Sequence, residues 1–197
     1  MKKIILSAFA LILICQAIAQ TGTAKAAAAP TASSKFFTKS GKAYFSATSS
    51  LEKIEATTNK TTAVIDLAAG KVEVKLLIKT FHFEKALMEE HFNENYLESG
   101  KFPNASFAGD IVDAKSVNLA KDGIYVVKVK GKLTMHNVTK DIETTAAVTV
   151  KGGAATGAKT EFVTKMADYN IAIPTAVKEK VAKEAKISID LALQPLK

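Results

Sequence analysis

The sequence contains no tryptophan, and among its 197 residues it has one cysteine, four prolines and four tyrosines. With no tryptophan and only four tyrosines, a platform for stacking nucleic-acid bases has little support. The single cysteine, Cys15, lies in the N-terminal segment, so a chain that loses this segment has no disulfide and depends on its core alone. A Gly-rich phosphate loop and a G-x-S-x-G elbow are also missing. The absences therefore leave no familiar catalytic motif.

Charge is in excess on the basic side, with 27 Lys and Arg against 19 Asp and Glu, a formal net charge of +8. Such a balance suits nucleic acid or an anionic membrane surface. The lysines, however, alternate along the predicted strands and do not gather into a block. We therefore interpret them as a solvated exterior and expect no nucleic-acid partner. The content of 48% hydrophobic and 23% charged residues is typical of a globular protein.

The N-terminus has the pattern of a secretory signal peptide over residues 1–19. A lysine pair precedes an unbroken apolar run, which ends in small residues with a predicted cleavage site after Ala19. The run is short for a membrane span and no second one follows, so we expect no integral membrane segment in the mature chain and a periplasmic or secreted location. Cleavage at this site removes two lysines, so the mature chain carries a net charge of 25 − 19, or +6. The alternative, lipidation at Cys15, is disfavoured because Ile14 stands where a small residue is needed.

Composition then divides the remainder of the chain into two parts. Residues 20–35 are rich in Ala, Thr and Ser, which predicts a flexible linker. Residues 36–197 carry the alternating apolar patterns of strands and are predicted to form a single domain.

The most regular alternation runs over residues 124–150 and predicts a long antiparallel β-hairpin with one apolar face. A polar break at residues 137–140 separates its two arms, and Gly131 interrupts the apolar series, which indicates a bend or a close backbone approach. The apolar face comprises Tyr125, Val127, Val129, Leu133, Met135, Ile142, Ala146, Val148 and Val150.

Further strands are predicted on both sides of this hairpin. Residues 36–48 contain strand formers around a turn at Ser40–Gly41, and residues 54–58 and 63–67 form two short strands separated at Asn59–Lys60. The other predicted strands cover residues 71–83, 105–112, 159–166 and 186–193, with a loop closed by Gly157 before the third of these. Short helices are expected within residues 84–100 and 175–183. About eight strands with local connections favour an all-β antiparallel barrel or sandwich.

Three segments of the chain resemble the YceI-like family of exported, polyisoprenoid-binding proteins. Residues 131–140 (GKLTMHNVTK) are similar to the family's G-x-L-T-x-H-G-V-T-K element, with Asn137 in place of Gly. Residues 91–98 and 101–107 are similar to its H-L…F-F-D…Y-P-x-x-x-F stretch, and residues 168–171 to a turn near its end. The resemblance implies an eight-stranded antiparallel lipocalin-like β-barrel with one or two short helices. It also implies an isoprenoid or fatty-acyl-type lipid held inside.

The inward apolar positions agree with that mechanism, because a barrel of this size either packs its interior or keeps one small cavity. An uncharged wall binds by removing apolar chain from water, at about 0.8 kcal/mol per CH₂, or roughly 3–4 kcal/mol per isoprene unit. The predicted lining residues are Val72, Val74, Leu76, Ile78, Phe81, Phe83, Phe92, Val127, Val129, Leu133, Met135, Ile142, Val148, Phe162, Ile187, Ile189 and Leu191.

The three histidines, His82, His91 and His136, are the remaining candidates for chemistry. Their spacing matches no HExxH or EF-hand template, so we expect neither a metal site nor a cofactor nor catalysis. His91 occupies the family's matched histidine position and is a candidate polar contact at the barrel mouth.

Three hypotheses about function follow from the sequence. The first is a lipid-sequestering or lipid-carrying barrel, and the second is a structural or stress-related barrel with a packed core and no ligand. The third is an enzyme that uses the histidines, a hypothesis that no sequence motif supports.

Overall fold

The structure is a computed structural model that describes residues 33–49, 51–175 and 181–196. The predicted signal peptide, most of the predicted linker and the central part of the helix predicted over residues 175–183 lie outside the described residues. No helix in the described ranges is long and apolar enough to cross a membrane.

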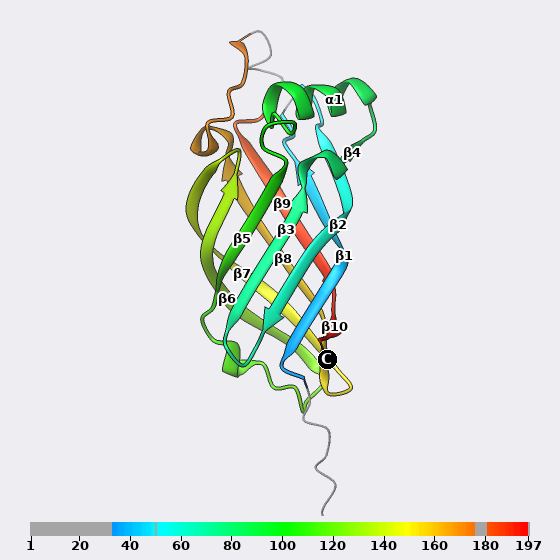
Figure 1. Ribbon diagram of the computed structural model, residues 1–197, viewed down its shortest axis with the longest axis vertical. Helices are drawn as coiled ribbons and strands as arrows, with labels where there is room; N and C mark the ends of the chain where they lie inside the picture. Colours follow the sequence, from blue (N-terminus) through cyan, green and yellow to red (C-terminus); the bar gives the residue numbers. More distant parts are fainter. Residues whose placement is uncertain (1–32, 50, 176–180, 197) are drawn as a thin grey trace, which may run out of the picture. The chain divides into compact units, whose positions relative to one another are not determined.

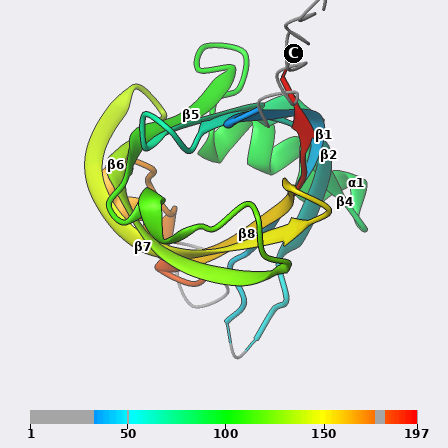
Figure 2. The ribbon, with the colours of Figure 1, turned by 90° about the horizontal axis from the view of Figure 1, so that it is seen from below.

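Eight long strands of the described chain form one closed, antiparallel barrel (Figures 1 and 2). Each pairs with its neighbours in the order β1-β9-β8-β7-β6-β5-β3-β2, and β1 pairs with β2 to close the ring. Two-residue strands β4 (His82–Phe83) and β10 (Gln194–Pro195) extend its margins. The long strands are β1 (Lys35–Ser46), β2 (Glu55–Asp66), β3 (Lys71–Leu77), β5 (Asn104–Ile111), β6 (Gly123–Met135), β7 (Val138–Lys151), β8 (Ala154–Lys165) and β9 (Glu184–Ala192). The predicted fold class is thereby confirmed.

The central hairpin, β6 and β7, is paired over its whole length from Gly123↔Val150 to Met135↔Val138. Its turn is shorter than the predicted polar break, because only His136 and Asn137 connect the strands. Both have positive φ, 50° and 59°, as is required of a two-residue hairpin turn whose twist matches that of the flanking strands. The following residues 138–140, polar though two of them are, belong to β7.

Two predicted interruptions are wrong, since β1 and β2 each run through them as continuous strands. The turn-type residues Ser40–Gly41 and Asn59–Lys60 lie at facing shifts of register, between Thr38 and Ala43 of β1. Such bulges bend a strand without ending it, which a small closed barrel needs. The loop predicted up to Gly157 is also wrong. Glycines 152 and 153, with φ of 60° and 82°, make a tight turn, and Gly157 is paired within β8.

One short α-helix, α1 (Ala86–His91), lies at one end of the barrel (Figure 1) and continues into a π-helical turn, η2 (Phe92–Tyr96). The short helix predicted within residues 84–100 is thereby confirmed. Three 3-10 turns complete the described elements: η1 (Ile78–Thr80), η3 (Ala114–Ser116) and η4 (Met166–Tyr169). The turn η1 divides the strand predicted over residues 71–83 into β3 and β4.

Strand alternation directs the apolar side chains into the barrel. Phe36, Ile65, Val127, Val148 and Leu191 are all buried, while the lysines of the same strands lie outside. Several of these lysines pair across strands with acidic residues, for example Lys130 with Glu143 at 3.1 Å and Lys159 with Asp190 at 2.8 Å. The basic residues thus make a solvated, internally paired exterior.

Candidate functional site

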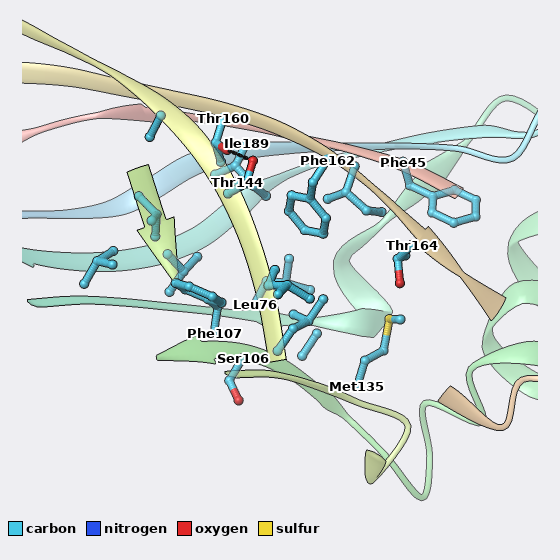
Figure 3. Close-up of a pocket in the computed structure, with 18 of the residues that line it drawn as sticks. Phe45, Leu76, Ser106, Phe107, Met135, Thr144, Thr160, Phe162, Thr164 and Ile189 are labelled. Atoms are coloured by element: carbon cyan, nitrogen blue, oxygen red, sulfur yellow. Dashed lines mark hydrogen bonds between the residues drawn. The ribbon is translucent and has the colours of Figure 1, made fainter. Parts of the chain in front are cut away.

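The interior of the barrel contains an apolar cavity of about 150 Å³ (Figure 3). All eight long strands contribute to its wall. One inward residue from each is Phe45 of β1, Ile65 of β2, Val72 of β3, Phe107 of β5, Val127 of β6, Val148 of β7, Phe162 of β8 and Ile187 of β9. Because every strand turns its apolar face to the same space, the cavity is a property of the whole barrel.

Large apolar side chains on this wall are only half-buried although they point inward. Val74, Leu76, Phe107, Phe162 and Ile187 all retain accessible surface, and all line the cavity. In a solidly packed core such side chains lose their accessible surface to neighbours. The lumen is therefore not filled by the protein's own side chains.

The size of the cavity sets what it admits without rearrangement. An apolar void of this order stays dry and takes a small apolar molecule. A longer chain requires some wall side chains to change rotamer, and Met135 and Met166 are the most adaptable of them because their thioether side chains are unbranched.

The structure places every predicted lining residue except Phe83 on the cavity wall. Phe83 lies outside, in a second pocket at the α1 end, where His91 is also found. His91 is exposed, and whether it contacts a ligand stays a prediction. Phe45, Ile65 and Phe107 line the cavity but are not among the predicted residues. Phe45 and Phe107 are aromatic residues within strands, and their inward direction follows from register and not from composition.

Phe107 owes its position to two facing glycines. Gly109 of β5 and Gly131 of β6 are directly paired. A Cβ at either glycine would meet backbone atoms of the opposite strand and would lie 2.8 or 2.7 Å from Cζ of Phe107. The close backbone approach predicted at Gly131 is thus confirmed, and it provides the room over which the Phe107 ring lies in the lumen.

The second pocket, which we call the mouth pocket, has a volume of about 420 Å³. It shares Phe45, Phe92, Leu97 and Met166 with the wall of the inner cavity. Phe92 is the first residue of η2 and lies between the mouth pocket and the inner cavity. Its ring centroid lies 5.3 Å from that of Phe45, 5.7 Å from Phe81 and 4.9 Å from Phe83. One buried aromatic residue, held by three others, thus separates the two spaces.

The mouth pocket has two charged side chains among the described residues, Glu52 and Lys85, and is also lined by the exposed His91. Lys85 Nζ lies 3.6 Å from Glu52 Oε1, so that its charge is already paired. Burial, and then the negative charge of Glu52, raise the pKa of the Tyr96 phenol on the same wall. The mouth therefore combines an apolar surface with one neutralised ion pair.

The three histidines do not converge on one site. His136 is held by Tyr169 and Glu98, His82 lies 3.7 Å from Glu89, and His91 faces the mouth pocket. Within the described ranges no group of three or more His, Cys, Asp or Glu is close enough to hold a metal ion.

An antiparallel eight-stranded barrel around an unfilled apolar lumen defines a lipocalin-like β-barrel protein. The chain belongs to the YceI-like domain family, whose sequence profile matches residues 28–193. No curated protein gives a significant sequence match.

Solved structures of similar fold include the following three. A polyisoprenoid binding domain from Saccharophagus degradans, implicated in plant cell wall breakdown, is 15% identical with a TM-score of 0.68, over 83% of this chain and 99% of that one. Burkholderia cenocepacia BcnA is 16% identical with a TM-score of 0.61, over 78% and 94% of the two chains. A mutant of Campylobacter jejuni YceI with a monobromobimane guest is 19% identical with a TM-score of 0.55, over 75% and 87%. At these identities the likeness concerns the fold.

Proposed function

We propose that the barrel binds a long apolar lipid, an isoprenoid or fatty-acyl-type chain, in its lumen and sequesters or carries it. The observation that supports this most is the wall of the cavity, which is apolar on all eight strands and carries half-buried side chains facing an unfilled space. Such a wall gives binding free energy only to a molecule whose apolar surface is removed from water when it binds, at about 0.8 kcal/mol per buried CH₂.

The volume of the cavity implies that binding is accompanied by rearrangement. A chain longer than a small apolar molecule fills more than about 150 Å³ and must displace side chains such as Met135 and Phe92. Moving Phe92 joins the inner cavity to the mouth pocket, which adds about 420 Å³. The ligand then lies with its apolar chain in the lumen and one end at α1.

The family supports the same class of ligand, since the similar domain from S. degradans is described as a polyisoprenoid binding domain. The pattern of residues 1–19 supports export, so we propose that the protein acts in the periplasm or outside the cell. Fractionation of cells that express the full chain tests this location. Full-length protein that stays in the cytoplasm contradicts the location, and export that persists after removal of residues 1–19 contradicts the role of this segment as the signal.

The small cavity is the one observation that favours the second candidate, a barrel that binds no lipid. In that case the void is a packing defect and admits small apolar molecules only. Filling the lumen from one position separates the two. Ala146 lines the cavity at the middle of β7, and Ala147, the next residue, faces the opposite side.

The experiment is a titration of the protein with geranylgeraniol, followed by native mass spectrometry. We expect one molecule per chain for the unaltered protein and for Ala147→Phe, and a loss of at least tenfold in affinity for Ala146→Phe. Absence of binding to the unaltered protein contradicts the proposal, and so does equal binding by both variants when circular dichroism shows them folded.

A further inference from the structure

The hydroxyl groups around the cavity are not equivalent. Ser106 alternates with the inward Phe107 and its hydroxyl is directed away from the lumen (Figure 3). The hydroxyls of Thr144 and Thr160 lie 3.2 Å apart and bond to the backbone oxygens of Glu161 and Thr145, at 3.1 and 2.8 Å. These two threonines are therefore satisfied by the protein.

Thr164 differs from them because its hydroxyl is directed into the lumen. It is the last inward residue of β8, is 7% exposed and lines the cavity at the α1 end. Figure 3 shows its oxygen directed towards Met135 across the cavity. An otherwise apolar wall thus has one polar atom that a ligand can reach at this end.

A second hydroxyl lies beside it. Tyr169, at the end of η4, is 1% exposed, and its phenol oxygen has no hydrogen-bond partner within the described residues. Burial raises the pKa of the Tyr169 phenol and the nearby Thr164 hydroxyl partly offsets the rise, although the two hydroxyls do not form a hydrogen bond. A buried hydroxyl without a partner costs free energy, so this arrangement favours any ligand that aligns the pair.

The charges around the two pockets restrict the kind of ligand. Lys159 contributes to the cavity wall but its ammonium group is outside, 2.8 Å from Asp190. Lys85 in the mouth pocket is paired with Glu52. Among the described residues that line the two pockets, both lysines are thus already paired, and transfer of an unpaired anion into an apolar site is strongly unfavourable.

We propose that Thr164 and Tyr169 form a polar subsite for an uncharged oxygen at one end of the lipid, a hydroxyl or carbonyl group. Tyr169 donates to the Thr164 oxygen, and Thr164 donates to the ligand oxygen. The ligand is then a neutral, oxygen-terminated lipid, oriented with its polar end towards α1. This inference rests on the proposed function, since it assigns the class and direction of the ligand in the same lumen.

The test compares three probes of similar chain: geranylgeraniol, the hydrocarbon phytane and geranylgeranyl phosphate. We expect the unaltered protein to prefer the alcohol to the hydrocarbon by roughly five- to tenfold, as one additional hydrogen bond implies. We expect the phosphate to bind more weakly than the alcohol. The ratio of the two neutral affinities is then compared between variants, so that differences in the solubility of the probes cancel.

In Thr164→Val the preference for the alcohol should disappear while hydrocarbon affinity stays the same, and Tyr169→Phe should reduce it in part. Thr160→Val is the matched control and should keep the full preference, because the Thr160 hydroxyl is bonded to the protein. Equal preference in Thr164→Val and the unaltered protein, or tighter binding of the phosphate, overturns the subsite but leaves lipid binding intact. Failure of all three probes to bind contradicts the proposed function itself.

Discussion

The imidazole Nε2 of His136 lies 2.8 Å from Oε2 of Glu98, and this contact joins the β6–β7 turn to the segment that follows α1. Nδ1 of the same ring lies 2.9 Å from the carbonyl oxygen of Tyr169, and the ring packs edge-on against Phe102. The carbonyl and the carboxylate both accept hydrogen bonds, so both contacts are made at once when each ring nitrogen carries a proton. His136 and Glu98 both have positive φ, 50° and 41°. This clip holds the α1 end of the barrel and the backbone of Tyr169 together.

Loss of the clip should destabilise the protein. In His136→Asn the new residue tolerates the positive φ, so the substitution removes the ring contacts without backbone strain. We expect a loss of about 1–2 kcal/mol in the free energy of unfolding, because the ring is buried but Glu98 is partly exposed. Urea denaturation at neutral pH measures it. His82→Asn is the control and should have little effect, since His82 is exposed and 3.7 Å from Glu89. Equal effects of the two substitutions contradict a structural role for the clip.

The facing glycines predict a sharp positional effect. Gly131→Ala places a Cβ against the backbone of β5 and 2.7 Å from the Phe107 ring, so strands or ring must move. We expect a loss of about 1–3 kcal/mol or more, as for other overpacked sites. Gly123→Ala, at the start of the same strand, has no contact closer than 3.8 Å and is the control. Thermal unfolding of both variants, followed by circular dichroism, measures the difference. A Gly131→Ala protein as stable as Gly123→Ala would show that the strands separate without cost.

Phe92 should control passage between the mouth pocket and the lumen. Phe92→Ala removes the ring that contacts Phe45, Phe81 and Phe83, which should cost about 3–5 kcal/mol in stability and join the two spaces. We expect bound geranylgeraniol to dissociate faster from this variant, measured by transfer of the lipid to vesicles. Phe83→Ala removes a ring outside the inner cavity and should change the dissociation rate less. Unchanged dissociation from Phe92→Ala contradicts a gate at this residue.

Acid should weaken the barrel partly through Asp66. The backbone N–H of Ala69, and to a smaller extent Lys35, lower the pKa of the Asp66 carboxyl from its ordinary 3.8. A carboxyl whose folded-state pKa is lowered stabilises the fold above its unfolded-state pKa, and this stability is lost as pH falls through the folded value. We therefore expect Asp66→Asn to flatten the dependence of unfolding free energy on pH below about pH 4.

The order of the two causes is testable with a second variant. Lys35→Met removes the smaller contribution and should keep most of the slope, because the Ala69 N–H still donates to the carboxylate at 3.0 Å. Urea unfolding at several pH values between about 2.5 and 6 measures the unfolding free energy of both variants. A Lys35→Met protein that behaves like Asp66→Asn would make the ion pair the dominant cause.

Alternation along the strands predicted an all-β antiparallel fold and most of the residues on its wall, and the resemblance to the YceI-like family then favoured a barrel over a sandwich. Val127, Val129 and Leu133 follow one face of a long hairpin, and a one-residue error of register would have reversed them. The interpretation of turn-type residues as strand ends failed at Ser40–Gly41 and Asn59–Lys60. Turn-type residues there form bulges between paired strands, and only the partner strand distinguishes a bulge from a turn.

The features that give the lumen its character depend on contacts distant in sequence. Phe107 is held over Gly109 and Gly131 of two strands, and Tyr169 is placed by His136, which is 33 residues away. Whether the apolar faces meet or leave a cavity depends on barrel geometry, since the same residue types suit both outcomes. For this reason the alternation predicts the wall but not the space that it encloses.

The central claim is that the lumen is a binding site for one lipid chain, and native mass spectrometry of the purified protein tests it most directly. The protein is measured as isolated, after extraction with organic solvent and refolding, and after incubation with geranylgeraniol. We predict a single apolar adduct in the first and third samples and none in the second. No adduct in any sample of folded protein, or adducts of variable number that persist in Ala146→Phe, would contradict the account.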